Sequence, residues 1–391
     1  MAVPLNQTLV KKENKLTVLQ IVKTQSPISR AETAQITGLN KGTVSSLVAE
    51  LITEEFIHEI GHGESSGGRK PVMLHFQAGA GYSIGIDLGV HYLLGLLTDL
   101  QGHIITKIHQ PLHSTDLDSV VSDLEHLIQT LINQAPPSHY GVIGIGIGVP
   151  GIVSKDGTIL SAPNLDWKRV EIKSRLMQRF DSNVWVDNEA NFGAIGEKAF
   201  GSNVAGENIL YVSAGIGIGA GLILGSELYK GAKGYAGEVG HMTMEMNGPL
   251  CRCGNSGCWE LYASEQALLN KLDQVNSLEA CLELAAKGNE EILMTFNQLA
   301  HDLGVGIVSL IHTFSPNQII IGNRLSLAEK YLEAELHRTL QSRMLPEQLA
   351  NTSIVFSSLR NKSTALGASG YASEQFLLNP VEHKKNPQQT F

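Results

Sequence analysis

The chain has 391 residues, a formal net charge of −9 and four cysteines. This length is too great for one ordinary core and suggests two or three domains, while four cysteines are too few for a disulfide scaffold. No charged N-terminal segment leads into an apolar run, and no apolar run reaches the roughly 18 residues that span a bilayer, so we expect a cytoplasmic protein with reduced thiols and no membrane association.

Charge is distributed unevenly along the chain. Residues 1–80 carry eight lysines and arginines against seven glutamates, so the acidic excess lies downstream. This asymmetry favours a small N-terminal module that can approach phosphate groups, joined to a larger body with another task.

Three helices are predicted in this module. Residues 14–23 carry apolar side chains at helical spacing. Ser29 and Glu32 have the spacing of a capping box, and Gly38 suits the left-handed position after a short helix. From Lys41 to Glu54, apolar residues recur at i, i+3, i+4, i+7 and i+8, which is the pattern of an amphipathic helix.

Two strands follow these helices, at residues 55–61 and 71–76, joined by a glycine-rich basic turn. Three helices and a hairpin describe a winged helix-turn-helix over residues 1–78. Its candidate DNA contacts are polar and cationic side chains that can reach phosphates, base edges and the minor groove. They are Lys41, Thr43, Ser45 and Ser46 on the second helix of the pair, and Arg69 and Lys70 in the wing. The alternative is a helical module that binds another protein.

The sequence changes character at Gly81. Three short β-rich runs precede a helical stretch at about 116–134 and a buried strand at 141–151. The second half repeats this order and ends in a helix from about residue 363. The repetition predicts a duplicated α/β unit with a ligand-binding cleft between two lobes. We assign residues 79–200 to the first lobe, 201–378 to the second lobe and 379–391 to a polar tail.

Three of the four cysteines lie within eight residues, downstream of a histidine. His241, Cys251, Cys253 and Cys258 offer one imidazole and three thiolates, which can complete a tetrahedral zinc site with no open position. In a reducing compartment a metal explains this spacing better than disulfides do, so we expect a structural Zn²⁺. The alternative is that the thiols only line a glycine-rich turn. The fourth cysteine, Cys281, is expected to be a small core residue.

Several motifs occur together in the order seen in one known family: IGIDLG, GVPGIV, APNLDW, DNEANFGAIGE, AGIGIGAG, GEVGH and CRCGNSGCWE. From about residue 14 to 372 the chain resembles the ROK family of sugar kinases and sugar-responsive repressors. The resemblance implies an α/β protein in which a winged helix-turn-helix, carried only by the repressor branch, precedes a two-lobed actin-like (ribonuclease-H-like) body. It also implies a homodimer. Two stretches, GESSGGRKPVML and NGPLCRCGNSGCWELYASE, are most similar to repressors that respond to xylose.

The resemblance further implies a sugar site. Carboxylates and amides bind the neighbouring hydroxyls of a free sugar, and an imidazole can join them. At the matching positions this chain has Asn164, Asn188, Glu189, Glu238, His241 and Glu260. His241 would then serve both the metal and the sugar, and the zinc site would hold the sugar-binding side chains in place.

Four departures from the family's kinase pattern argue against ATP binding. The first phosphate turn, residues 87–91, has Val90 and His91 where the kinases have a second glycine and a threonine. The loop at 215–219 lacks its usual hydroxyl residue, and Asn323 replaces a glycine. Glu189 stands at the position of the catalytic aspartate, one methylene longer. We therefore expect no catalytic residues and no enzyme activity.

The sequence thus predicts a DNA-binding transcriptional repressor of xylose-utilisation genes that leaves a palindromic operator when free xylose binds. Two other functions stay open: an ATP-dependent sugar kinase with a regulatory head, and a zinc-dependent adaptor whose winged helix docks a protein. The residues do not decide the sign of the sugar effect on DNA binding, nor do they distinguish xylose from a hexose.

Overall fold

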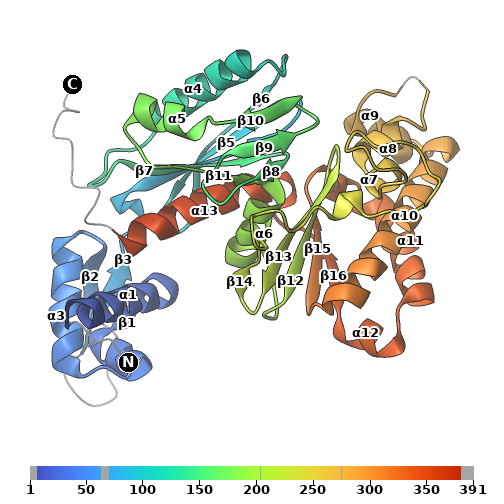
Figure 1. Cartoon of the computed structure of the whole chain (residues 1–391). Helices are drawn as coiled ribbons and strands as arrows, with labels where there is room; N and C mark the ends of the chain where they lie inside the picture. The colour runs from blue at the N-terminus through green and yellow to red at the C-terminus, as the bar shows by residue number, and fades with distance from the viewer. Residues whose placement is uncertain (1–6, 63–69, 203, 274, 380–391) are drawn as a thin grey trace.

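A computed structural model of the chain describes residues 7–62, 70–202, 204–273 and 275–379. Figure 1 shows an N-terminal module at one end, two large β-sheets in the body and a group of helices at the other end. The module contains three helices and a three-stranded antiparallel sheet of order β1-β3-β2, the arrangement of a winged helix-turn-helix. Its elements are α1 (Gln7–Gln25), β1 (Ile28–Ser29), α2 (Arg30–Thr37), α3 (Lys41–Thr53), β2 (Ile57–His62) and β3 (Val72–Phe76).

The predicted starts and ends of α2 and α3 are confirmed, whereas α1, predicted at residues 14–23, extends further in both directions, from Gln7 to Gln25. The backbone N–H of Glu32 donates to Ser29 Oγ at 3.2 Å, and the Ser29 N–H donates to Glu32 Oε2 at 2.9 Å, which completes the capping box. Gly38 follows α2 in the left-handed conformation, with a φ of 69°. Asn40 begins α3 because its side-chain oxygen accepts the Thr43 N–H at 2.8 Å.

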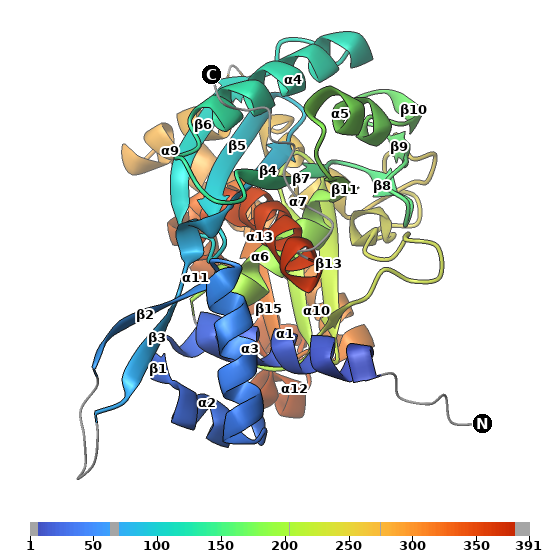
Figure 2. The ribbon, with the colours of Figure 1, turned by 90° about the vertical axis from the view of Figure 1, so that its left-hand side faces the viewer.

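The amphipathic pattern of α3 corresponds to its packing. Val44, Leu47, Val48 and Leu51 are buried in the module's core. The opposite face is open, since Lys41, Ser45 and Ser46 are exposed and Thr43 is half-buried. In Figure 2, the hairpin of β2 and β3 extends away from the body. Lys70 lies at its described end and is exposed, whereas Arg69 lies outside the described residues.

The predicted duplication of an α/β unit is confirmed by the topology of the two large sheets. The first has the order β11-β7-β4-β5-β6 and the second β14-β13-β12-β15-β16. In each, three antiparallel strands are followed by two that join in parallel. The strands are β4 (Tyr82–Leu88), β5 (Tyr92–Asp99), β6 (Ile104–Pro111), β7 (Val142–Val149) and β11 (Val184–Asn188), then β12 (Ile209–Ala214), β13 (Ile218–Leu224), β14 (Glu227–Leu228), β15 (Gln318–Gly322) and β16 (Ser353–Phe356).

A third, smaller sheet lies in a stretch where the sequence analysis identified a motif but no strands. It has the order β10-β9-β8. These strands are only two to four residues long, and strands this short carry little periodicity in the sequence. They are β8 (Ile152–Val153), β9 (Ile159–Ala162) and β10 (Trp167–Val170), and the turn between β9 and β10 contains Asn164.

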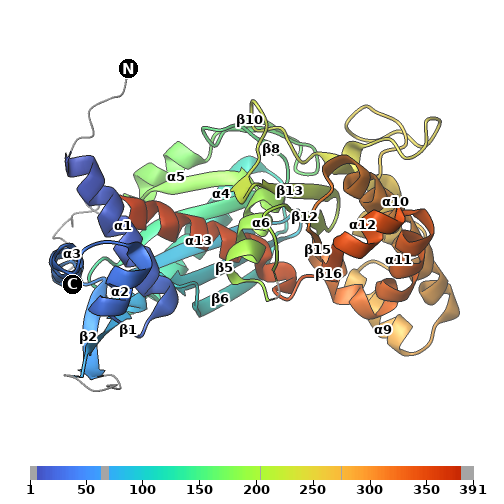
Figure 3. The same cartoon turned by 90° about the horizontal axis from the view of Figure 1, so that it is seen from below.

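Helices cover the large sheets on both faces. Apolar side chains of α4 and α5 belong to the core of the first sheet, and those of α9, α10 and α11 belong to the core of the second. Figure 3 shows the latter helices grouped at the end opposite the N-terminal module. Apart from the pair described next, the helices of the body are α4 (Leu117–Asn133), α5 (Lys173–Phe180), α7 (Glu260–Ala263), α8 (Glu265–Leu269), α9 (Leu278–Ala286), α10 (Glu290–Phe314), α11 (Glu329–Arg343) and α12 (Pro346–Asn351). Cys281 on α9 is buried in this core, as expected.

Two helices pack across the boundary drawn at residue 200. Helix α13 (Ser363–Leu378) comes from the end of the chain but lies on the first sheet, and α6 (Glu189–Phe200) packs on strands of the second. Glycines permit this close approach: a Cβ at Gly85 would lie 1.8 Å from the Ala365 oxygen, and one at Gly367 would lie 1.7 Å from the Phe192 oxygen. The α6–α13 pair therefore joins the two halves of the body (Figure 1).

The N-terminal module rests on the end of α13 through an aromatic cluster. Phe56 stacks on Tyr140 of the body at 5.0 Å between ring centroids, and Phe376 meets both rings edge-on. The Tyr140 hydroxyl also donates to the Glu54 carbonyl oxygen at 2.8 Å. No helix in the described ranges is long and apolar enough to cross a membrane.

Candidate functional site

A cavity of about 660 Å³ lies between the two halves of the body. All six residues that the resemblance marked for sugar binding line it, although they are spread over 97 positions of sequence, from 164 to 260. They come from the turn before β10, the start of α6, the segment after β14 and the start of α7. They are Asn164, Asn188, Glu189, Glu238, His241 and Glu260.

One wall of the cavity holds two carboxylates on either side of an imidazole. Nε2 of His241 lies 3.9 Å from Glu238 Oε2, and Nδ1 lies 3.5 Å from Glu260 Oε1. His241 ends the short 3₁₀ turn η2 (Val239–His241), which Glu238 precedes. Burial raises the pKa of the Glu238 carboxyl above its ordinary value. These groups offer donors and acceptors for the adjacent hydroxyls of a sugar.

The opposite wall is formed where β11 passes into α6. Asn188 caps that helix: its side-chain oxygen accepts the backbone N–H of Ala190 at 2.7 Å, and its amide nitrogen donates to the Gly151 oxygen at 2.9 Å. The cap fixes the direction of the Asn188 side chain and leaves one amide hydrogen for a ligand. Glu189 is half-buried beside it and accepts from Ser213 Oγ at 3.1 Å. Burial raises the pKa of Glu189 to about 7.

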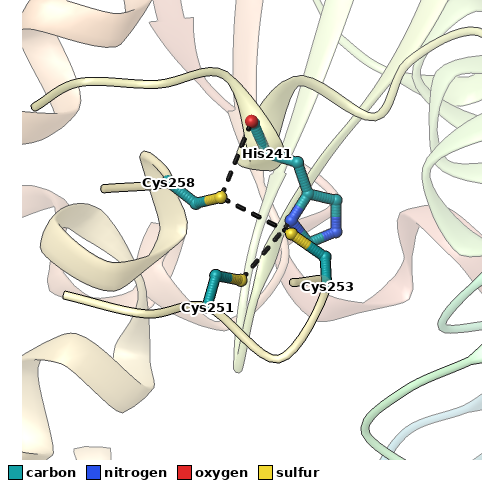
Figure 4. Close-up of side chains that lie close together, drawn as sticks. All are labelled: His241, Cys251, Cys253 and Cys258. Carbon is teal, nitrogen blue, oxygen red and sulfur yellow. Dashed lines mark hydrogen bonds between the residues drawn. The ribbon is translucent and has the colours of Figure 1, made fainter. Parts of the chain in front are cut away.

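The predicted metal ligands lie together next to the first wall (Figure 4). Their ligand atoms all lie within 4.8 Å of one another. Cys253 Sγ is 3.6 Å from Cys258 Sγ, and Cys251 Sγ is 3.8 Å from His241 Nδ1. Tetrahedral Zn²⁺, with bonds of about 2.0–2.3 Å, separates its ligand atoms by about 3.3–3.8 Å. The cluster therefore has the residue types and spacing of a metal centre.

The two ring nitrogens of His241 face different partners. Nδ1 points toward the sulfur atoms, and Nε2 lies on the side of Glu238. One imidazole can thus bind a metal through Nδ1 and leave Nε2 for a ligand in the cavity. Burial raises the pKa of the Cys251 and Cys258 thiols, so a cation in the cluster is what would favour their thiolate form.

The far end of the cavity holds groups that the sequence analysis did not assign to the site. Tyr92 and Arg324 line it together with Asn323. The Tyr92 hydroxyl donates to Asp87 Oδ2 at 2.9 Å, and Arg324 pairs with Glu265 at 2.7 Å. The available signal was that Asn323 and Arg324 follow the buried strand β15, which ends at Gly322, because strand ends border clefts in α/β folds.

Asp87 is the most buried acid of this region. Burial and the neighbouring charge of Glu189 raise its pKa to about 8. One of its oxygens, Oδ1, has no hydrogen-bond partner. The Asn323 amide donates to Ser213 Oγ at 2.9 Å, which links Asn323 to the Glu189 side of the site. This end of the cavity is thus occupied by a network of protein side chains.

A further residue missed by the sequence analysis is Arg252. It stands between two of the clustered cysteines, lines the cavity and donates from Nη1 to Asn164 Oδ1 at 3.4 Å. The contact joins the cysteine loop to the turn before β10, on the other side of the cavity. The sequence offered one signal for it, because Arg252 is the basic residue enclosed by the C-x-C pattern.

This chain belongs to the ROK family, whose model matches residues 83–375. It is 43% identical over 375 residues to the xylose repressor of Bacillus spizizenii, covering 95% of this chain and 98% of that one. A crystal structure of a ROK family transcriptional regulator, a homologue of the E. coli MLC protein, matches with a TM-score of 0.79 and 27% identity over 94% of this chain and 98% of that chain. A Streptomyces griseus ROK glucokinase, solved with glucose and AMPPNP, matches with a TM-score of 0.70 and 26% identity over 75% of this chain and 99% of that chain.

Proposed function

We propose that this chain is a transcriptional repressor that binds operator DNA through its winged helix and free xylose in the central cavity. The observation that carries the proposal is the 43% identity to a xylose repressor over 95% of the chain, which includes the N-terminal module as well as the body. The glucokinase match, in contrast, covers only 75% of the chain. Similarity in both the module and the body supports a protein in which ligand binding changes DNA binding.

The proposed xylose site uses the two walls of the cavity. Glu238, His241 and Glu260 would bind neighbouring hydroxyls from one side. Asn164, Asn188 and Glu189 would bind from the other. Xylose binding between the walls would favour one arrangement of the two halves, and release from DNA requires that this arrangement bind the operator less well.

The proposed DNA contacts belong to the N-terminal module. Lys41, Thr43, Ser45 and Ser46 would enter the major groove from the open face of α3, and Arg69 and Lys70 would follow the minor groove beside it. A homodimer would present two such modules to a palindromic operator, with half-sites about one or two helical turns apart.

The proposed metal is a structural Zn²⁺ held by His241, Cys251, Cys253 and Cys258. With four protein ligands it has no open position for a water molecule, so it would supply rigidity and not chemistry. Its role would be to fix Glu238, His241 and Glu260 in the wall of the cavity.

A kinase reaction is disfavoured by the contents of the far end of the cavity. A Cβ placed on Gly89 would lie 2.3 Å from the Tyr92 ring, so that ring covers the turn that would have to approach a phosphate. Val90 and the longer Glu189 add to this departure. We therefore propose that the chain does not phosphorylate its sugar.

Two measurements on the purified, zinc-loaded protein test the proposal. Calorimetric titration with xylose, glucose and N-acetylglucosamine, repeated with Glu260→Ala, should give heat with xylose that the variant loses. Binding to a labelled promoter fragment should weaken when xylose is added. Absence of heat from all three sugars would remove the xylose assignment. If xylose instead strengthened DNA binding, its effect on repression would be the opposite of the one proposed.

The two other functions have their own tests. Sugar-dependent ADP formation at high ATP would establish the kinase. Promoter binding that does not fall with rising salt would favour the protein-docking adaptor, because neutralisation of DNA phosphates makes affinity salt-dependent.

A further inference from the structure

The segment between β14 and Glu238 leaves the second sheet, contacts the first half of the body and returns to β13, where the Ala220 N–H donates to the Gly237 oxygen at 2.8 Å. It leaves β14 at Leu228 and ends at the 3₁₀ turn that carries His241. In between, Gly234 approaches the first half of the body so closely that a Cβ there would lie 2.8 Å from the Val153 oxygen. The segment is therefore in contact with β8, although it belongs in sequence to the second half.

One ion pair fixes this contact. Nζ of Lys230, in the segment, contacts Oδ2 of Asp187, the residue before Asn188 at the end of β11. Asp187 is buried, and Lys230 is about two-thirds buried. Because this pair is shielded from water, dissolved ions weaken the attraction between its two charges far less than they weaken that of a surface pair.

The other oxygen of Asp187 is committed to the start of α6. Its Oδ1 accepts the backbone N–H of Asn188 at 2.8 Å and the side-chain amide of Asn191 at 2.9 Å. The carboxylate thus holds the turn that carries Asn188 and Glu189 with one oxygen and the segment after β14 with the other. One residue connects both walls of the cavity.

We propose that Lys230 is a positioning residue for the sugar: its ion pair with Asp187 holds the segment that carries Glu238 and His241 at the correct distance from Asn188 and Glu189. Lys230 does not line the cavity and acts only through Asp187. The inference rests on the proposed function, because it assumes that the cavity binds a free sugar.

The test compares xylose affinity and stability across a double-mutant cycle of Lys230→Met and Asp187→Asn. Lys230→Met should weaken xylose binding about tenfold, a typical coupling between a site and a remote contact. It should also lower the unfolding midpoint, because it leaves the buried Asp187 charge without its cation. Lys233→Met, an exposed lysine three residues further along the same segment, should change neither quantity.

The double variant separates positioning from charge compensation. Replacing both partners removes the unpaired charge, so stability should return toward that of the unmodified protein. The link between the two walls is still absent, so xylose affinity should stay about tenfold weaker. Recovery of both stability and affinity in the double variant would overturn the positioning role, and so would unchanged affinity in Lys230→Met. If Lys230→Met does not fold, the double variant alone decides between these outcomes.

Glu260→Ala distinguishes failure of this inference from failure of the proposed function. If Glu260→Ala loses xylose binding while Lys230→Met keeps it, the cavity is the sugar site and only the inference is wrong. If both variants bind xylose like the unmodified protein, the sugar binds elsewhere, and both the site and the inference are wrong.

Discussion

Half-buried Tyr92 and buried Asp87 form a hydrogen-bonded pair at the end of the cavity, with the tyrosine hydroxyl 2.9 Å from Oδ2 of the carboxyl. The Tyr92 ring lies against Gly89 in the turn between their strands. The Tyr92 ring therefore covers the turn at Gly89. Burial of the Asp87 carboxyl strongly disfavours its charged form.

The first prediction concerns the pH dependence of stability. An aspartate in an unfolded chain titrates near pH 4, whereas the pKa of folded Asp87 is about 8. Between these values the folded state binds more protons, so the free energy of unfolding falls as the pH rises from about 4 to about 8. Asp87→Asn should remove at least about 1 kcal/mol of that fall.

Urea unfolding at about pH 5.5 and about pH 8.5 measures this difference. Asp273→Asn, at an exposed position on the second half of the body, is the matched control and should keep the full pH dependence. Equal pH dependence in Asp87→Asn and in the unmodified protein would contradict the prediction.

A second prediction concerns the open face of α3. Lys41→Ala should weaken binding to promoter DNA and reduce the slope of log affinity against log salt by about 1, because one phosphate contact is lost. Fluorescence anisotropy at several salt concentrations gives both quantities. Lys287→Ala, an exposed lysine on the far side of the body, should leave the slope unchanged. A slope that stays the same in Lys41→Ala would mean that Lys41 does not contact a phosphate.

The cysteine cluster supports a third prediction. Cys253→Ala should reduce bound zinc from about one ion per chain to well below that, because removal of one of four ligands opens the site. Xylose affinity should fall as well, since the metal would no longer hold His241. Atomic absorption and calorimetry measure the two effects. Cys281→Ala, the matched cysteine outside the cluster, should retain the metal. Full zinc and full xylose response in Cys253→Ala would rule out the metal site.

The aromatic cluster at the end of α13 gives a fourth prediction. Tyr140→Ala removes the stack on Phe56 and the edge contact with Phe376, which should cost about 3 kcal/mol. This loss of stability should mainly weaken the contact between the N-terminal module and the body. Hydrogen exchange should therefore accelerate in α1 and α3 more than in α10. Tyr229→Ala, at a side chain that is 50% exposed, serves as the control. Uniform acceleration along the chain would show that the cluster is not specific to this contact.

The sequence by itself determined most of the local elements of the N-terminal module. The capping box at Ser29, the stripe on α3 and the glycine after α2 depend on side chains a few positions apart, so the chain carries their signals directly. The cysteine spacing likewise indicated the cluster. The six candidate sugar residues were a different case, because single asparagines and glutamates carry no signal of their own and only the motifs connected them.

The tertiary structure decided which distant residues meet. Lys230 and Asp187 are 43 positions apart, and nothing in the sequence near either one specifies the other. Helix α13 lies on the first sheet because glycines on β4 and β7 admit its backbone, a fit that depends on three elements at once. Tyr92 fills the turn at Gly89 for the same kind of reason. Local patterns follow from neighbours along the chain, whereas these contacts follow from the packing of elements that the chain brings together only on folding.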